Sequence, residues 1–278
     1  MVSTSTLITC IIAMLLCLLL PPVILLVYAR NNSGRKIPSA WLLGAAGFFV
    51  TQMVIRVPIL TVLQMQPRFA GFAKNHGFLY AFTMAFTAGL FELAGRFAVA
   101  KLMHRKSNLT CRRGFAAGLG HGGIEAMLLV GMTYLNNILY IFMINAGTFD
   151  AMVTQAAQTG VDVSALWQIK DQLIQSSPAL FLLGVYERIL AMTCHVAMSM
   201  LVCYGIRTKQ PVKGALICLG IHTMIDLSAG INMLAGTAIS QTAAYVIIYA
   251  LLTATAVLSI FIIRNIFRHW KETEVNHV

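Results

Sequence analysis

The chain has 278 residues, of which 58% are hydrophobic and 10% charged, with a mean hydropathy of +0.78 and a net charge of +11. A soluble domain carries about 25% charged residues, so this composition excludes a soluble enzyme and predicts an integral membrane protein with the lipid bilayer as a partner. The positive charge falls in short clusters between apolar runs and forms no basic stripe interleaved with aromatic residues, so we predict no nucleic-acid binding.

Several apolar stretches approach or exceed the roughly 20 residues that a membrane-spanning helix needs. In chain order they cover about 7–28, 39–63, 77–102, 114–144, 178–205, 213–236 and 242–264. The first stretch has no Lys or Arg before it and no small-residue cleavage site after it, so we expect an uncleaved span. The pattern predicts an all-α, polytopic helical bundle of about seven transmembrane helices that forms a single transmembrane domain over residues 1–278.

The basic residues predict the orientation. Lys and Arg gather in the loops that follow odd-numbered spans and in the C-terminal tail, whereas the other loops carry only Arg68, Lys74 and Lys170. Because cytoplasmic loops are enriched in Lys and Arg, we predict that the N-terminus lies outside and the C-terminus in the cytoplasm.

One loop is long, at about 146–177, and is predicted to lie on the outer side. It carries apolar residues at helical spacing, namely Val163, Leu166, Trp167, Leu173 and Ile174. This spacing predicts a short helix that lies on the membrane interface, with Trp167 at the level of the lipid headgroups.

Ionisable residues nevertheless fall inside the predicted spans. Each central Arg, Lys or Asp costs roughly 2.5–3.5 kcal/mol on insertion scales, so such residues usually face a partner or a wet cavity. They are Arg56, Glu92, Arg96, His121, Glu125, Glu187, Arg188, His195, His222 and Asp226.

Three pairs of these residues are four positions apart and therefore share one helix face. They are Glu92 with Arg96, His121 with Glu125, and His222 with Asp226. Counted from the cytoplasmic end of each span at 1.5 Å per residue, these six residues and His195 lie roughly 10–20 Å deep. We therefore predict one site, built from four helices in the cytoplasmic half. Arg56, Glu187 and Arg188 lie in the outer half, where we expect a separate structural role.

The fourth span begins with GFAAGLGHGGIEA, residues 114–126. So many glycines are consistent with a broken or re-entrant segment, with close helix packing, or with close approach of the backbone to a substrate. The sequence leaves these alternatives open.

The predicted site suits peptide hydrolysis, which needs an activated water, a proton donor and a stabilised oxyanion. Either Glu92 or Glu125 is a candidate general base, and the histidines with Arg96 are candidate oxyanion donors. Asp226 is a candidate to orient His222. Alternatively, zinc would activate the water, with His121, His195, His222 and Glu125 as candidate ligands. No HExxH or GxSxG motif is present.

At these residues the sequence resembles the YhfC family of membrane peptidases, related to the CAAX-prenyl endopeptidase and bacteriocin-processing superfamily and to PrsW-type proteases. The superfamily pattern is E(E)xxxR on one helix, His or Glu on the next, and HxxxN or HxxxD on the fourth. Here the segments ELAGR, GHGGIEA and HTMID match, and ERILAMTCH adds Glu187, Arg188 and His195 from the intervening helix. The doubled Glu of the first motif is Phe91–Glu92 here, which leaves one carboxylate.

The resemblance covers a catalytic-like core of four helices at about 77–236. It implies an intramembrane endopeptidase, glutamic-type or metal-dependent, that acts on membrane-associated peptide or protein substrates in a bacterial cell membrane. Two rival hypotheses are a proton-coupled transporter, because carboxylate and His chains also carry protons, and a non-catalytic membrane scaffold.

The predicted orientation can be tested by cysteine labelling of the loop between Lys101 and Arg113. We expect labelling only from the cytoplasmic side, because this loop is rich in Lys and Arg. Labelling from outside the cell would contradict both the orientation and a site in the cytoplasmic half.

Overall fold

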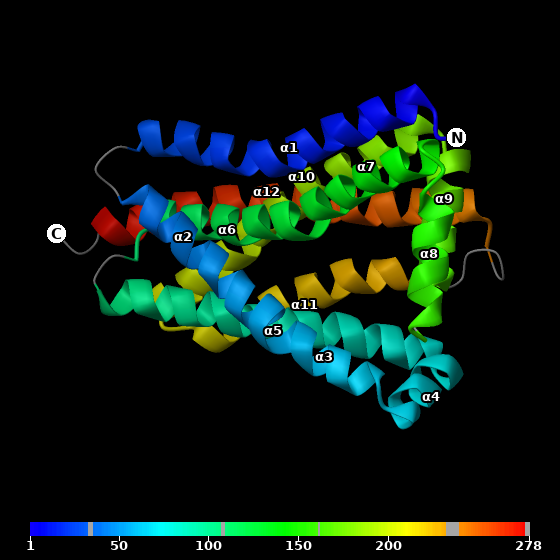
Figure 1. Cartoon of the computed structure of the whole chain (residues 1–278). Helices are drawn as coiled ribbons and strands as arrows, with labels where there is room; N and C mark the ends of the chain where they lie inside the picture. The colour runs from blue at the N-terminus through cyan, green and yellow to red at the C-terminus, as the bar shows by residue number, and fades with distance from the viewer. Residues whose placement is uncertain (33–35, 107–108, 161, 232–238, 276–278) are drawn as a thin grey trace. The chain divides into compact units, whose positions relative to one another are not determined.

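The computed structural model describes residues 1–32, 36–106, 109–160, 162–231 and 239–275, and within them the chain is all-α, with no strand. Figure 1 shows the helices in chain order. They are α1 (Thr4–Arg30), α2 (Ile37–Phe48), η1 (Phe49–Arg56), α3 (Val57–Gln64), α4 (Pro67–Asn75), α5 (Gly77–Arg105), α6 (Cys111–Glu125), η2 (Ala126–Gly131), α7 (Met132–Asn145), α8 (Phe149–Gln158), α9 (Ser164–Gln175), α10 (Pro178–Arg207), α11 (Pro211–Ala229) and α12 (Gln241–Val275). The segments η1 and η2 are π-helices.

Six helical stretches in the described part of the chain are long and apolar enough to cross a membrane: Thr4–Arg30, Ile37–Gln64, Gly77–Arg105, Cys111–Asn145, Pro178–Arg207 and Gln241–Trp270. They coincide with six predicted spans. The remaining predicted span, 213–236, corresponds to α11, and its residues 232–236 lie outside the described residues. The seventh crossing and the orientation therefore stay predictions.

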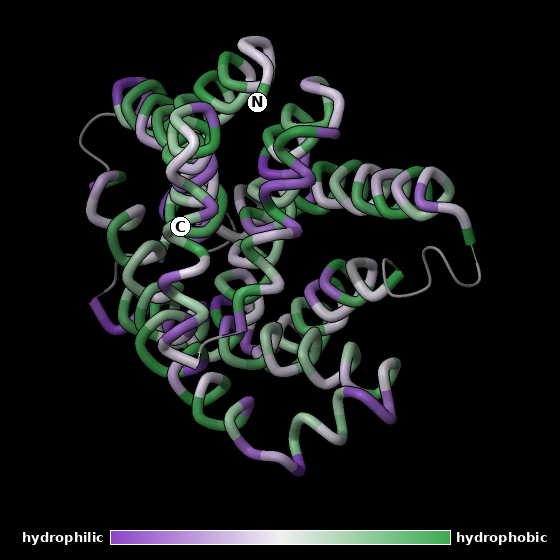
Figure 2. Tube along the Cα trace, turned by 45° about the vertical axis from the view of Figure 1, so that its right-hand side comes forward, coloured by the Kyte–Doolittle hydropathy of each residue, from purple (hydrophilic) through white to green (hydrophobic). Residues whose placement is uncertain are grey.

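Large apolar side chains are exposed along these helices, as a lipid-facing surface requires. Leu26, Val62, Val246 and Phe261 are each more than half exposed. Hydrophobic residues run along the helices, with hydrophilic ones scattered between them (Figure 2). In a bilayer such side chains face lipid tails, and each helix satisfies its own backbone hydrogen bonds.

The chain forms two compact units, and each combines distant segments. Unit 1 comprises Met1–Pro22 and Ala126–Ile189, and unit 2 comprises Val23–Glu125 and Leu190–Val278. The single domain over 1–278 stays a prediction, as does the four-helix core at 77–236.

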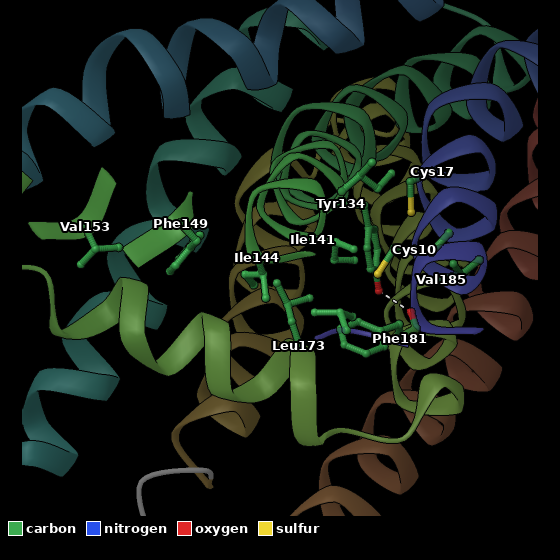
Figure 3. Packing of buried hydrophobic residues seen from close by; sticks show 13 residues of the cluster. Cys10, Cys17, Tyr134, Ile141, Ile144, Phe149, Val153, Leu173, Phe181 and Val185 are labelled. Carbon is green, nitrogen blue, oxygen red and sulfur yellow. Dashed lines mark hydrogen bonds between the residues drawn. The ribbon is translucent and has the colours of Figure 1, made fainter. Parts of the chain in front are cut away.

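Unit 1 has its own apolar core (Figure 3). Cys10 and Cys17 of α1 lie in the same cluster as Ile141 of α7. The hydroxyl of Tyr134 donates a hydrogen bond to the carbonyl of Phe181, which links α7 to α10. The cysteines here are small packing residues.

Four of the five predicted interfacial residues lie on α9, Val163 is the residue before it, and α8 precedes both. Between α8 and α9, Gly160 has φ of 79°, a left-handed conformation that favours glycine and ends α8. Asp162 accepts a hydrogen bond from the backbone N–H of Ser164, 2.9 Å away, and this bond lowers the pKa of Asp162. Leu173 is buried, whereas Trp167 is exposed to 38%. A position on the membrane interface stays a prediction for α9.

In unit 2, α2 crosses α6 in very close contact (Figure 1). A Cβ on Gly120 would lie 1.9 Å from the carbonyl oxygen of Trp41. A Cβ on Gly44 would lie 1.9 Å from the carbonyl oxygen of Ala117. Small residues let two backbones approach in this way in membranes, where lipid tails are as apolar as the side chains.

The continuous helix and these contacts bear on two of the three alternatives for the glycine-rich segment, and close approach of the backbone to a substrate stays a prediction. The helix runs without a break from Cys111 to Asn145, with η2 in its middle. The prediction of a broken or re-entrant segment is therefore wrong. The helix tolerates these glycines because it packs closely against α2. Close helix packing explains Gly120.

We predict that Gly120→Ala lowers stability by about 1–3 kcal/mol or more, because the added methyl group forces α2 and α6 apart. Gly220→Ala is the matched control, since a Cβ there meets nothing within 4 Å. It should stabilise α11 by about 0.5–1 kcal/mol. Unfolding in detergent measures both, and equal effects of the two changes would contradict the packing role of Gly120.

Candidate active site

The carboxylate of Glu92 on α5 is the centre of a buried polar cluster in unit 2. Its Oε2 atom lies 3.0 Å from Nη2 of Arg96, one helical turn further along α5. The same oxygen lies 2.9 Å from Nε2 of His121 on α6 and 2.7 Å from Nε2 of His222 on α11. Three helices therefore meet at one carboxylate oxygen.

A glycine on α5 brings α11 close enough for this contact. Gly89 lies one turn before Glu92, and a Cβ there would lie 3.3 Å from Cβ of His222 and 3.1 Å from Leu219. A larger residue would push α11 away from α5. The reach of His222 to Glu92 thus depends on the absence of a side chain at position 89.

His195 on α10 brings a fourth helix to the cluster. Its Nδ1 lies 2.5 Å from Nη2 of Arg96 and 3.7 Å from Oε2 of Glu92. Its Nε2 lies 2.7 Å from Oε2 of Glu125 on α6. Gly122 leaves room for the His195 side chain, because a Cβ at 122 would lie 3.0 Å from Cβ of His195.

His222 has a second carboxylate neighbour on its own helix. Oδ2 of Asp226 lies 3.3 Å from Nδ1 of His222, on the side of the ring that faces away from Glu92. The side chain of Asp226 is 34% exposed, whereas that of Glu92 is 5% exposed. Asp226 therefore lies at the edge of the cluster and Glu92 at its centre.

The three imidazole rings lie close together around Glu92. The rings of His121 and His195 stack with centroids 5.3 Å apart, and those of His195 and His222 meet edge to face at 5.8 Å. Phe48 of α2 covers His121 from another side, with ring centroids 5.3 Å apart. This packing fixes the ring orientations and keeps bulk water away from the buried carboxylate.

Arg96 keeps unused hydrogen-bond donors. The residue is 3% exposed, and among the described residues its Nε and Nη1 atoms have no hydrogen-bond partner. Buried donors are normally satisfied, so orphaned ones point to a missing acceptor such as a bound molecule.

The structure brings together all seven residues that the sequence singled out: Glu92, Arg96, His121, Glu125, His195, His222 and Asp226. Their catalytic roles remain a proposal. The sequence analysis missed Gln52, which is buried and donates a hydrogen bond to Oε1 of Glu92 at 2.9 Å. It is neutral, so a search for ionisable residues passes over it, although an amide in an apolar span is itself a signal.

Arg56 is not separate from the cluster, contrary to expectation, and its role stays a prediction. Its Nη1 donates a hydrogen bond to Oε1 of Gln52 at 3.3 Å, which links it to the cluster. Gln52 and Arg56 are four positions apart, the same spacing that identified the other pairs. Glu187 instead pairs with its neighbour Arg188, in unit 1.

Three of the clustered residues could hold a metal ion. Glu92, His195 and His222 each offer one ligand atom, and these atoms lie within 4.8 Å of one another. The group shares His195 and His222 with the predicted zinc ligands, and has Glu92 in place of His121 and Glu125. All three residues are buried.

Comparison with known proteins identifies the family. The model of the YhfC intramembrane metalloproteases matches residues 16–250. The chain belongs to this family. It is also 29% identical over 251 residues to a Bacillus subtilis (strain 168) protein described as uncharacterized membrane protein YhfC, with 89% of this chain and 92% of that one covered. No solved structure matches the chain.

Membership of the YhfC family confirms the resemblance seen in the sequence and supports a protease. Together with the six apolar helices, it makes the chain an integral membrane protein. The relation to the CAAX-prenyl endopeptidase superfamily and to PrsW stays a prediction.

We predict that Glu92→Leu lowers the free energy of unfolding by about 3–5 kcal/mol, because it leaves the buried charge of Arg96 without its partner. Asp150→Asn is the control, since it breaks an ion pair with Lys170 in which Asp150 is 59% exposed. That change should cost less than about 1 kcal/mol. A Glu92→Leu variant as stable as the wild type in detergent would contradict this role.

Proposed function

We propose that this YhfC-family protein is an intramembrane endopeptidase that hydrolyses peptide bonds of membrane-associated substrates at a zinc site held by Glu92, His195 and His222. One observation carries the proposal. His222 has Glu92 at one ring nitrogen and Asp226 at the other. His195 has Arg96 and, at 3.7 Å, Glu92 at one ring nitrogen and Glu125 at the other.

This arrangement is typical of metal-binding histidines. A metal-ligating His nearly always directs its other ring nitrogen to a carboxylate, a carbonyl or water, which fixes the tautomer and raises the basicity of the ligand. Both candidate ligands in this cluster have such a carboxylate within 3.3 Å. A histidine that only packs between helices needs no carboxylate behind it.

The donor set also fits zinc. Catalytic zinc sites have three protein ligands from His, Glu, Asp or Cys and keep a fourth position for water or substrate. Two imidazoles and one carboxylate within 4.8 Å of one another meet this requirement. Calcium and magnesium prefer oxygen ligands, so two nitrogen donors favour zinc or another transition metal.

The charge balance points the same way. Around the cluster lie three carboxylates, those of Glu92, Glu125 and Asp226, and two guanidiniums, those of Arg96 and Arg56. With neutral imidazoles, one negative charge is left over. Asp226 is partly exposed, so this excess is modest, and it favours a bound cation over a bound anion.

A metal ion bound there would supply a water acidified enough to attack a peptide carbonyl. The residues of the chain supply the rest. The unused Nε and Nη1 donors of Arg96 are available to the oxyanion that forms on attack. His121 is outside the ligand group and donates its Nε2–H to Glu92, so it would be the proton donor for the leaving amine. The proton of the attacking water would pass to a carboxylate of the cluster, for which Glu125 beside His195 is the candidate.

The glutamic-type alternative uses a carboxylate as the general base without a metal. Glu92 accepts hydrogen bonds on both oxygens, from Gln52 on Oε1 and from Arg96, His121 and His222 on Oε2. To accept a proton from water, Glu92 would have to lose one of these donors. Glu125, against His195, is therefore the better candidate base in that scheme. Metal binding would instead replace the proton between His222 and Oε2, because a ligating imidazole is deprotonated at that nitrogen.

The substrates would be membrane-associated peptides or proteins, cut in the cytoplasmic half of the bilayer of a bacterial cell membrane. The orientation predicted from the basic loops supports the cytoplasmic side. The buried position of Glu92 supports cleavage shielded from bulk water.

We expect purified protein in nanodiscs to contain zinc and to cleave members of a fluorogenic peptide library. A chelator should abolish cleavage and added zinc should restore it. Glu92→Gln should lose both the metal and the activity. Glu125→Gln and Asp226→Asn should keep the metal, with affinity or activity about 10–100-fold lower, because these carboxylates contact the ligating histidines and not the metal itself. Asp150→Asn should match the wild type.

The outcomes separate the mechanisms. Cleavage by metal-free protein that is lost in Glu125→Gln would overturn the zinc site and favour the glutamic mechanism. Folded wild-type protein that holds no metal and cleaves no peptide would overturn the peptidase and favour a transporter or scaffold.

A further inference from the structure

Two residues of the π-helix η1 extend the buried cluster beyond its ionisable core. Gln52 is 5% exposed and lies in the middle of the apolar stretch Ile37–Gln64. A buried amide in such a span is costly unless both its donor and its acceptor are satisfied. The π-helix is rare and is frequently found at functional sites.

The amide group of Gln52 holds one oxygen of Glu92. Its Nε2 lies 2.9 Å from Oε1 of Glu92 and 3.2 Å from the carbonyl oxygen of Ala88, one turn earlier on α5. Both of these neighbours are acceptors, so they use the two N–H donors of the amide. The other oxygen of Glu92, Oε2, is left to the histidines.

Arg56 fixes which way the amide points. Its Nη1 lies 3.3 Å from Oε1 of Gln52, and its Nη2 donates to the carbonyl oxygen of Met84 at 2.7 Å. A guanidinium has donors only, so the acceptor end of the amide must face Arg56. The donor end must then face Glu92.

The three groups form a polarised chain from a positive charge through a neutral amide to a negative one. Hydrogen bonds in such chains strengthen one another in a low-dielectric interior. A direct Arg56–Glu92 pair would compete for the carboxylate with Arg96. Because the amide of Gln52 lies between the two charged groups, Arg56 polarises only the hydrogen bond to Oε1 of Glu92.

We propose that Gln52 and Arg56 are positioning residues that hold Oε1 of Glu92, so that Glu92 presents Oε2 alone to the metal and the histidines. The inference rests on the proposed function, since it specifies how Glu92 acts there. Neither residue touches the reacting atoms. Without Gln52, Oε1 would have no side-chain donor among the described residues and could swing towards the metal.

The direct test is the infrared signature of the Glu92 carboxylate in purified protein in nanodiscs, assigned by difference against Glu92→Gln. Gln52→Met keeps the length of the side chain and removes its hydrogen bonds. We expect it to shift the carboxylate bands. Gln64→Met is the matched control, because Gln64 is the exposed last residue of α3, and should leave them unchanged.

Activity gives the second readout. Gln52→Met should lower kcat by about 10–100-fold, as expected for a residue that orients a ligand, with KM within about 2-fold of the wild type. Arg56→Met should act in the same direction. The double variant should be little worse than Gln52→Met alone, because the two residues act through one amide. Arg56→Lys keeps a charged donor and should recover part of the loss.

The readouts distinguish this inference from the proposed function. Glu92 bands that are unchanged in both Gln52→Met and Arg56→Met would overturn the positioning role even in an active enzyme. Shifted bands in a protein that cleaves nothing would support the positioning and overturn the peptidase. Should Gln52→Met fail to fold, the bands of Arg56→Met and Arg56→Lys decide the matter.

Discussion

A buried carboxylate is the constraint on which the interior of unit 2 depends. Glu92 lies in an apolar helix at 4% exposure, and an ion there costs several kcal/mol unless donors surround it. One helix cannot supply enough of them. Donors therefore come from η1, α6 and α11 as well as from Arg96 on α5 itself. The same hydrogen bonds join the helices and build the site.

This need explains the small residues along the helices. Lipid tails are as apolar as leucine, so helices in a bilayer gain little by burying apolar side chains against each other. Close backbone approach and polar contacts take over that role. Gly89 leaves room for His222, Gly122 leaves room for His195, and Gly120 leaves room for the backbone of Trp41. Each glycine removes a side chain where an imidazole or a neighbouring helix must pass.

The site also has an ordered outer layer. Glu125, Asp226 and Gln52 each lie one contact away from the central groups, behind His195, His222 and Glu92 respectively. Such partners set ring orientation and ligand basicity. Phe91 precedes Glu92, so no second carboxylate adjoins it in the chain, and all three contacts converge on Glu92 or on a histidine beside it. Hydrogen bonds to both oxygens of this one central carboxylate fix its orientation.

The sequence by itself determined the membrane class, six of the spans to within a few residues and the one-face pairs such as His222 with Asp226, because hydropathy and the helical repeat are local properties. It also singled out the seven residues that meet in the cluster. Only the tertiary structure decided that Glu92 is central, that Gln52 and Arg56 join it, and that the glycine-rich segment is continuous helix. Those outcomes depend on how each helix is rotated and how closely it packs, and backbone contacts such as that of Gly120 with Trp41 join residues far apart in the chain.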